Sequence, residues 1–106
     1  MGTPPQLTPE ERARALAQAK AARQRRAAIK SQVKDGSLSI HQVIELARTD
    51  EVIAKMRVLE LVESISGVGK IRGKALLERL EISLTRRIQG LGKHQMNDLI
   101  SQSSLP

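Results

Sequence analysis

The chain lacks cysteine, phenylalanine, tryptophan and tyrosine, and it has no long apolar run. Without cysteine it can form neither a disulfide nor a thiolate zinc site. The two histidines, His41 and His94, are too few for a metal site built from histidine alone, so we expect no metal and no other cofactor. Because no apolar segment approaches the roughly 20 residues of a membrane span, we expect a soluble, cytoplasmic protein without a membrane partner.

The missing aromatic residues also bear on nucleic-acid recognition. Proteins that read single strands or RNA sequence usually stack bases on aromatic side chains, and this chain cannot. Its formal net charge is nevertheless +7. Residues 1–36 hold eight basic and three acidic residues, residues 64–95 hold seven and two, and residues 37–63 hold three and five. Two basic regions around an acidic middle indicate a polyanionic partner, and the composition favours duplex nucleic acid held by its phosphates.

The N-terminal third of the chain is predicted to form one long basic helix over residues 8–35. Thr8 and Glu11 have the spacing of a capping box, and the segment that follows is almost wholly Ala, Gln, Lys and Arg, which favour helix. Ile29 and Val33 are large apolar residues on one face near its C-terminal end. We therefore expect that end to dock on the rest of the protein and the N-terminal half to project.

The rest of the chain is predicted to form one small helical domain over residues 37–101. Ser39 and Asp50 are good N-cap residues, and apolar residues at helical spacing follow each of them. Two further helices are expected over residues 70–80, with Ile71, Ala75, Leu76 and Leu80 pointing inward, and over residues 93–100. No strand pattern is present, so the predicted fold class is all-α. Residues 1–7 are expected to be a disordered tail, and residues 102–106 are expected to be a flexible tail.

Two Gly-x-Gly turns, at residues 67–69 and 90–92, are the most informative feature. Each follows an apolar segment and is followed at once by a lysine, Lys70 or Lys93, and by a predicted helix. Glycine tolerates positive φ and leaves the N–H groups at a helix start uncovered, which suits a phosphate. A lysine at the positively polarised start of a helix is unfavourable for the fold alone. A bound phosphate at each turn would compensate for it.

Residues 59–80 resemble the helix-hairpin-helix motif of many duplex-DNA proteins, because a Gly-Val-Gly-Lys turn joins two amphipathic helices. The longer connection to a second Gly-x-Gly is closer to the helix-two-turns-helix arrangement. With the segments at residues 7–12, 52–56 and 86–92, the chain is similar to the actinobacterial integration host factors over about residues 7–100. The resemblance implies a non-enzymatic, nucleoid-associated protein that binds double-stranded DNA with little sequence preference and bends it. We expect a monomer without a small-molecule substrate.

In that family the arginines before the second glycine turn face DNA, which implies the same role for Arg86 and Arg87. Most members carry a third basic residue two positions on, where this chain has Gln89. The residues expected to bind DNA are Gly67, Val68, Gly69, Lys70, Arg72, Lys74, Arg86, Arg87, Gln89, Gly90, Gly92 and Lys93. Secondary candidates on the long helix, for which a solvated face is an equal alternative, are Arg23, Arg26 and Lys30. A side chain inserted between base steps would be Val68, Leu84 or Leu91.

Two other functions are open to a chain of this kind. A small-subunit ribosomal protein uses the same helix-two-turns-helix, so structured RNA is the alternative ligand, although that family carries a long basic C-terminal tail that this chain lacks. Helix-hairpin-helix glycosylases place a catalytic lysine two residues after the second glycine of the turn. That position is Ile71 here, and we expect no catalysis.

Overall fold

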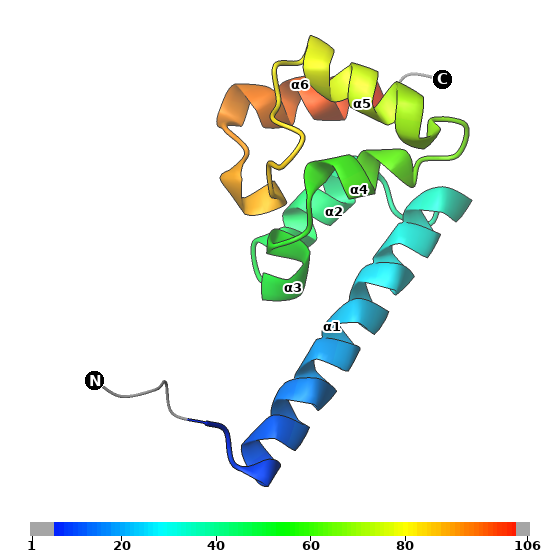
Figure 1. Ribbon diagram of the computed structural model, residues 1–106. Helices are drawn as coiled ribbons and strands as arrows, with labels where there is room; N and C mark the ends of the chain where they lie inside the picture. Colours follow the sequence, from blue (N-terminus) through cyan, green and yellow to red (C-terminus); the bar gives the residue numbers. More distant parts are fainter. Residues whose placement is uncertain (1–5, 104–106) are drawn as a thin grey trace.

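The computed structural model describes residues 6–103, and within them the chain is helical (Figure 1). The elements are α1 (Pro9–Asp35), α2 (Ile40–Ala47), α3 (Glu51–Ala54), α4 (Val58–Glu63), α5 (Gly69–Arg79), the 3-10 helix η1 (Ile88–Gly90) and α6 (Lys93–Ser103). Among these residues the only β-type pairing is an isolated bridge between Arg57 and Arg87. The predicted all-α fold is confirmed.

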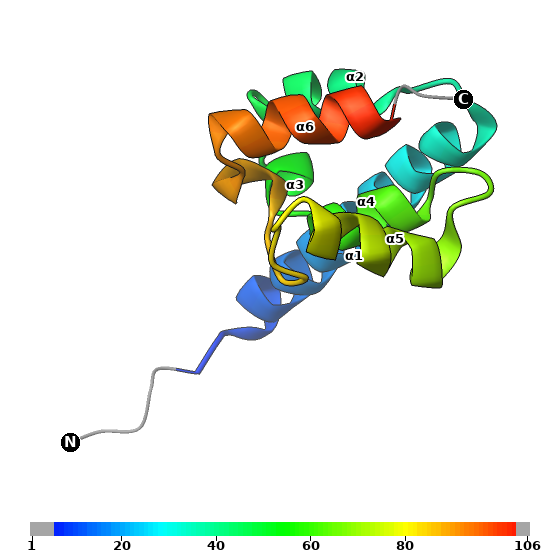
Figure 2. The same ribbon diagram turned by 90° about the horizontal axis from the view of Figure 1, so that it is seen from above.

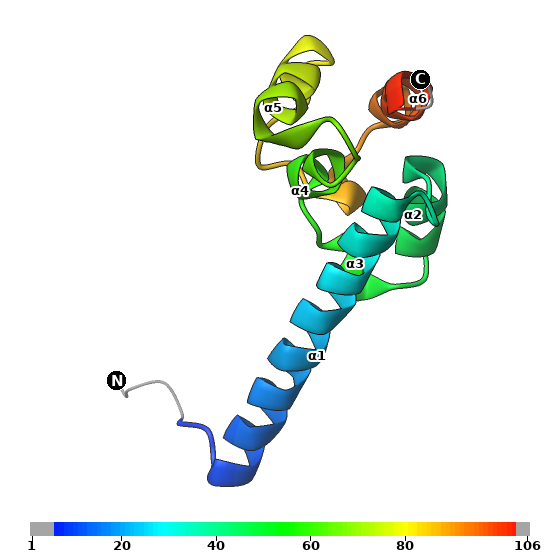
Figure 3. The same ribbon diagram turned by 90° about the vertical axis from the view of Figure 1, so that its right-hand side faces the viewer.

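Helix α1 has the predicted start and the predicted docked end. Thr8 Oγ1 accepts from the Glu11 N–H at 3.1 Å, and the Thr8 N–H donates to Glu11 Oε1 at 2.9 Å. Ile29 is fully buried and Val33 nearly so, whereas Leu16 is 66% exposed. Figures 1 and 3 show the N-terminal half of α1 standing clear of the other helices. The helix therefore docks through its last turns and presents the remainder to solvent.

The remaining helices enclose one core, with α4 packed between α1 and α5 (Figures 1 and 2). Ser39 and Asp50 cap α2 and α3 as predicted, Ser39 by accepting from Gln42 N and Asp50 from the N–H groups of Val52 and Ile53. The fully buried side chains that fill the core are Ile29, Ile53, Met56, Leu61, Leu77, Ile88, Leu99, Val43, Val58 and Val62.

Helix α5 faces the core differently from the prediction. Ile71 is 87% exposed and Ala75 is exposed, while Gly73 and Leu77 are buried. A Cβ atom on Gly73 would lie 3.2 Å from Glu63 Cγ, so the missing side chain is what lets α4 approach this closely. Leu76 and Leu80, which were also predicted to point inward, are half-buried against the core. The predicted stripe is therefore wrong at Ile71 and Ala75, because a glycine adds nothing to an apolar stripe and the face of Gly73 and Leu77 was overlooked.

The C-terminal boundary also needs a correction. Helix α6 continues through Ser103, so residues 102 and 103 belong to a helix and not to the predicted flexible tail. Residues 1–5 of the predicted N-terminal tail and residues 104–106 lie outside the described residues. The division of the chain into a long helix and a helical domain stays a prediction.

Candidate nucleic-acid interface

The first glycine turn has the backbone that the sequence predicted. Gly67 and Gly69 have φ values of 83° and 68°, a region that favours glycine. Helix α5 begins at Gly69 without a side-chain cap, and the N–H groups of Gly69, Lys70 and Ile71 have no acceptor among residues 6–103. Three backbone donors at a helix start are thus open to an anion.

Basic side chains surround these open donors. Lys70, Arg72 and Lys74 are all exposed on the first turns of α5. The guanidinium of Arg72 donates from Nη1 to the Gly67 carbonyl oxygen at 3.3 Å, which holds it against the turn. The remaining guanidinium donors are free to contact a phosphate.

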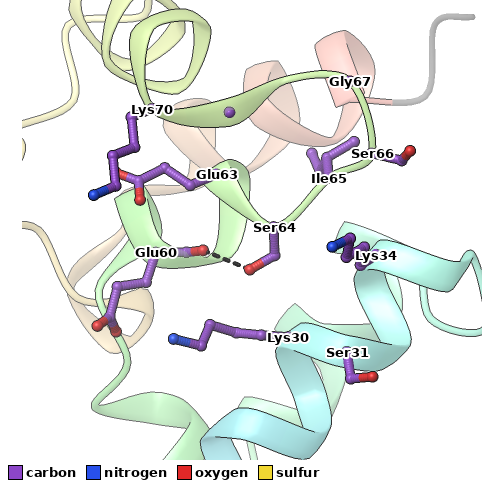
Figure 4. A pocket seen from close by; sticks show the side chains of 11 residues that line it. Lys30, Ser31, Lys34, Glu60, Glu63, Ser64, Ile65, Ser66, Gly67 and Lys70 are labelled. Atoms are coloured by element: carbon purple, nitrogen blue, oxygen red, sulfur yellow. Dashed lines mark hydrogen bonds between the residues drawn. The ribbon is translucent and has the colours of Figure 1, made fainter.

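A hollow of about 630 Å³ separates the first glycine turn from α1, and Lys30 and Lys34 line it from the helix side. Figure 4 shows Lys30 pointing from α1 toward Glu60, with the Ser64 hydroxyl donating to the Glu60 carbonyl oxygen at 2.8 Å. Lys30, a secondary candidate on α1, and Lys70 at the first turn therefore line the same hollow. Glu60 and Glu63 line the same hollow, so its charge is mixed.

The second glycine turn does not repeat the first. Gly90 ends η1, and neither Gly90 nor Gly92 has a positive φ. The N–H of Gly90 donates to Arg87 O at 2.9 Å and that of Gly92 to Gln95 Oε1 at 3.1 Å. The amides of Gly90 and Gly92 are therefore satisfied within the protein, and a phosphate seat at this turn stays a prediction. The bond made by the Gly92 amide has a signal in the sequence: Gln95 stands three residues after Gly92, at the position of a capping-box residue.

The structure also changes which of Val68, Leu84 and Leu91 could insert between base steps. Leu91 is 6% exposed and packs in the core, so it is unavailable for insertion between base steps. Val68 and Leu84 are half-buried against the core. Lys93, at the first position of α6, remains exposed beside the second turn.

Arg86 and Arg87 are exposed, and their backbone is fixed by pairing with the connection between α3 and α4. Val58 N donates to Arg86 O, and Ile88 N donates to Met56 O, both at 2.9 Å. Each guanidinium is also anchored: Arg86 Nη1 donates to Gly90 O at 3.2 Å, and Arg87 Nη1 donates to Lys55 O at 2.9 Å. One anchored N–H group leaves the other donors of each guanidinium for a phosphate or a groove edge.

A second hollow, of about 440 Å³, lies over this segment. It is lined by Ser83, Thr85, Arg86, Arg87, Gln89 and Gly90. Ser83 and Thr85 were not among the residues predicted from the sequence, although hydroxyl groups one to three residues before an arginine pair are a usable signal. Their hydroxyls lie 3.0 Å apart and add neutral hydrogen-bonding groups beside the two charges.

The two glycine turns lie on opposite sides of the helical domain. Figures 1 and 2 place the first turn, between α4 and α5, at one edge and η1 at the other. Of the secondary candidates, Arg26 lines a third hollow together with Arg87, and Arg23 is exposed on α1. The basic residues therefore form separated clusters on one molecule and not a single ring.

Neither a metal site nor a membrane span is found in the described part of the chain. Residues 6–103 contain no group of three or more His, Cys, Asp or Glu side chains placed to hold a metal ion. None of the helices in that range is long and apolar enough to cross a membrane. His41 is exposed, with Nε2 3.8 Å from Glu45 Oε1 on the next turn of α2.

The helices, the two turns and their order define a helix-two-turns-helix protein, and comparison with known proteins agrees. Residues 33–102 match the family model described as the S13-like H2TH domain. The chain is 50% identical to the integration host factor of Streptomyces coelicolor, covering 93% of this chain and 92% of that protein. It is 45% identical to the integration host factor of Mycolicibacterium smegmatis, covering 92% of this chain and 93% of that protein. The chain thus belongs to the actinobacterial integration host factor family.

A solved structure of sIHF bound to an 8bp palindromic DNA has the same fold. It matches with a TM-score of 0.81 and 43% sequence identity, covering 83% of this chain and 99% of that chain. That protein was therefore captured with duplex DNA on a fold shared with the chain described here.

Proposed function

We propose that this protein is a non-enzymatic, double-stranded-DNA-binding architectural protein of the bacterial nucleoid. The observation that carries the proposal is the exposed pair Arg86 and Arg87, whose guanidinium groups are pre-positioned. Their segment is held by two 2.9 Å bonds, from Val58 N to Arg86 O and from Ile88 N to Met56 O. Family membership and the DNA complex of the sIHF neighbour support it. The protein works in the cytoplasm as a monomer, without cofactor, catalysis or small-molecule substrate.

The two edges of the domain have different roles in this proposal. At the first turn the open N–H groups and the side chains bind backbone phosphates. At the second turn the neighbouring side chains do so, and Gly90 and Gly92 let the DNA backbone approach closely. The DNA-contacting residues are Gly67, Val68, Gly69, Lys70, Arg72, Lys74, Arg86, Arg87, Gln89, Gly90, Gly92 and Lys93, with Arg23, Arg26 and Lys30 as secondary contacts. Gln89 stands where the family carries a basic residue and contributes a neutral contact.

Phosphate contacts of this kind hold DNA without reading its sequence. A duplex held at both separated edges has to follow the surface between them, which favours a bent path. We infer that the protein bends DNA across its minor groove, as the family resemblance implies. Val68 and Leu84 are the remaining apolar candidates at that groove.

The test is the salt dependence of duplex binding by the protein and by Arg86→Ala/Arg87→Ala. About four phosphate contacts give a slope of log K against log salt near −3.6, and the double variant lowers its magnitude by about 1.8. The double variant should bind duplexes of different sequence more weakly by about the same factor. The matched control is Arg12→Ala/Arg48→Ala, which removes the same charge from exposed positions away from both turns.

Two results would contradict the proposal. Affinity that stays flat from low to moderate salt would exclude phosphate-driven binding. A structured RNA that displaces the duplex at stoichiometric concentration would assign the site to RNA, the alternative considered from the sequence.

A further inference from the structure

The third hollow on the surface, of about 320 Å³, gathers four cationic side chains from three separate segments of the chain. Arg26 comes from α1, Lys55 and Arg57 from the connection between α3 and α4, and Arg87 from the segment before η1. Glu60 is the acidic residue of its lining. Two of these cations lie in the acidic middle of the sequence, where no binding residue was predicted.

The four cations are only partly neutralised by the protein. The side chains of Arg26 and Arg57 make no hydrogen bond or ion pair with any residue from 6 to 103. Arg57 stands at the N-cap of α4 without a side-chain capping bond. Lys55 Nζ lies 2.9 Å from Glu51 Oε1, but that glutamate side chain is 80% exposed, where an ion pair contributes little. Concentrating like charges in this way is unfavourable unless an anion enters between them.

The backbone around the hollow is held in place. The bridge between Arg57 and Arg87 and the bond from Arg87 Nη1 to the Lys55 carbonyl oxygen hold these three backbone segments together and also position the Arg87 guanidinium. Arg26 is held from the other side, because the preceding residue, Arg25, pairs with Asp50 at 3.1 Å and because Ile29, one turn later, is fully buried. The backbone that carries the four cations is therefore in place before an anion binds, and the remaining cost is that of ordering the side chains of Arg26 and Arg57.

Arg87 lines this hollow and also the neighbouring one that contains Arg86 and Gln89. A ligand that carries regularly spaced phosphates and passes Arg87 can therefore occupy both. A single free anion would fill one of them and leave the other unsatisfied.

We propose that the cleft formed by Arg26, Lys55, Arg57 and Arg87 binds a backbone phosphate of the DNA strand that crosses the second turn, so that the docked half of α1 becomes part of the DNA-binding surface. This inference rests on the proposed function. It adds Lys55 and Arg57 to the interface and assigns Arg26 to a defined contact. The guanidinium forks of Arg26 and Arg57 are suited to bidentate binding of phosphate oxygens.

The experiment measures duplex binding of Arg26→Ala/Arg57→Ala by fluorescence anisotropy over a series of salt concentrations. Loss of the one phosphate contact made by this cleft reduces the magnitude of the log–log salt slope by about 0.9. At about 0.1 M salt the counterion contribution alone makes each contact worth about eightfold in affinity. Neither side chain makes a hydrogen bond or an ion pair with any residue from 6 to 103, so the variant should keep the thermal unfolding temperature of the unchanged protein. Arg12→Ala/Arg48→Ala controls for net charge.

A second measurement separates the DNA backbone from a free anion. The side-chain Nε–Hε resonances of Arg26 and Arg57 should shift on addition of duplex and not on addition of inorganic phosphate at equal ionic strength. If inorganic phosphate alone shifts them and the duplex does not, the cleft is a free-anion site and the inference is wrong.

The failure of this inference and that of the proposed function give different results. If Arg86→Ala/Arg87→Ala weakens binding while Arg26→Ala/Arg57→Ala behaves like the charge control, DNA binding stands and this cleft is outside the interface. If the unchanged protein shows no salt-dependent duplex binding, the proposed function itself fails.

Discussion

The carboxylate of Asp50 joins the long helix to the helical domain, because Oδ2 lies 3.1 Å from Arg25 Nε while Oδ1 caps helix α3. The capping oxygen accepts from Val52 N at 3.0 Å and from Ile53 N at 3.3 Å. One side chain therefore sets both the start of a short helix and the position of α1 beside it. The ion pair thus adds a polar contact between α1 and the start of α3 to the apolar docking of Ile29 and Val33.

The two tasks of Asp50 can be separated by substitution. Asp50→Asn keeps an oxygen that can cap α3 but removes the negative charge facing Arg25, and we expect a loss of about 0.2–1 kcal/mol of stability. Asp50→Ala removes the cap as well and should cost about 1 kcal/mol more. Urea unfolding followed by circular dichroism measures both. Equal losses in the two variants would mean that the cap contributes nothing.

The same group predicts a pH dependence. Burial of the carboxylate opposes its ionisation, but hydrogen bonds from Ile53 N, the Arg25 guanidinium and Val52 N outweigh this and hold the pKa of Asp50 below its ordinary value of 3.8. The unfolded chain then binds more protons than the folded protein, so stability is fully present above the unfolded pKa and falls as the pH drops through the folded one. Asp50→Asn should flatten this loss below about pH 4. If Asp50→Asn loses as much stability at low pH as the unchanged protein, other carboxylates cause the pH dependence.

The orientation of α5 is tested by two aliphatic residues, one exposed and one buried. Ile71→Ala should change stability by less than about 0.5 kcal/mol, because the side chain is 87% exposed. Leu77→Ala should cost about 2–5 kcal/mol, because the side chain is fully buried. Thermal or urea unfolding decides between this arrangement and the predicted stripe. A large loss of stability in Ile71→Ala would contradict this arrangement and favour the predicted apolar stripe.

Strain at the end of α5 gives a stabilising substitution. Glu81 has a φ of 58°, and the other positive-φ residues among the described ones are glycines. Left-handed backbone costs a residue with a side chain about 1–2 kcal/mol, which glycine avoids because it has no Cβ. The greater freedom of glycine in the unfolded chain offsets part of this gain. Glu81→Gly should therefore raise stability by a few tenths to about 1 kcal/mol. A destabilised variant would show that the Glu81 side chain makes a contribution larger than the strain.

Local elements of this fold were predictable from local residue patterns. The capping residues Thr8, Ser39 and Asp50 act within three residues of their own position, so tertiary context had little influence on them. The docked end of α1 followed from Ile29 and Val33, whose spacing can face only one side of a helix. The positive φ values of the first turn followed from its glycines.

The candidate site was predicted less completely. The basic residues were recognised from charge and from the resemblance, but the two Gly-x-Gly turns were treated as equivalent. They differ because Gln95 and the η1 carbonyl groups satisfy the amides of the second turn, which is a matter of competing hydrogen bonds. Lys55 and Arg57 were missed because charge counted along the sequence averages them with neighbouring glutamates.

By itself the sequence determined that this protein is helical, basic at two regions and built around two glycine turns, because propensity, capping and charge act over a few residues. Only the tertiary structure decided which face of α5 is buried, which turn keeps its amides open and which distant cations share a cleft. Those outcomes depend on packing between segments: the approach of α4 over Gly73, and the pairing that brings Arg57 beside Arg87. Such contacts join residues too far apart in the chain for any local pattern to record them.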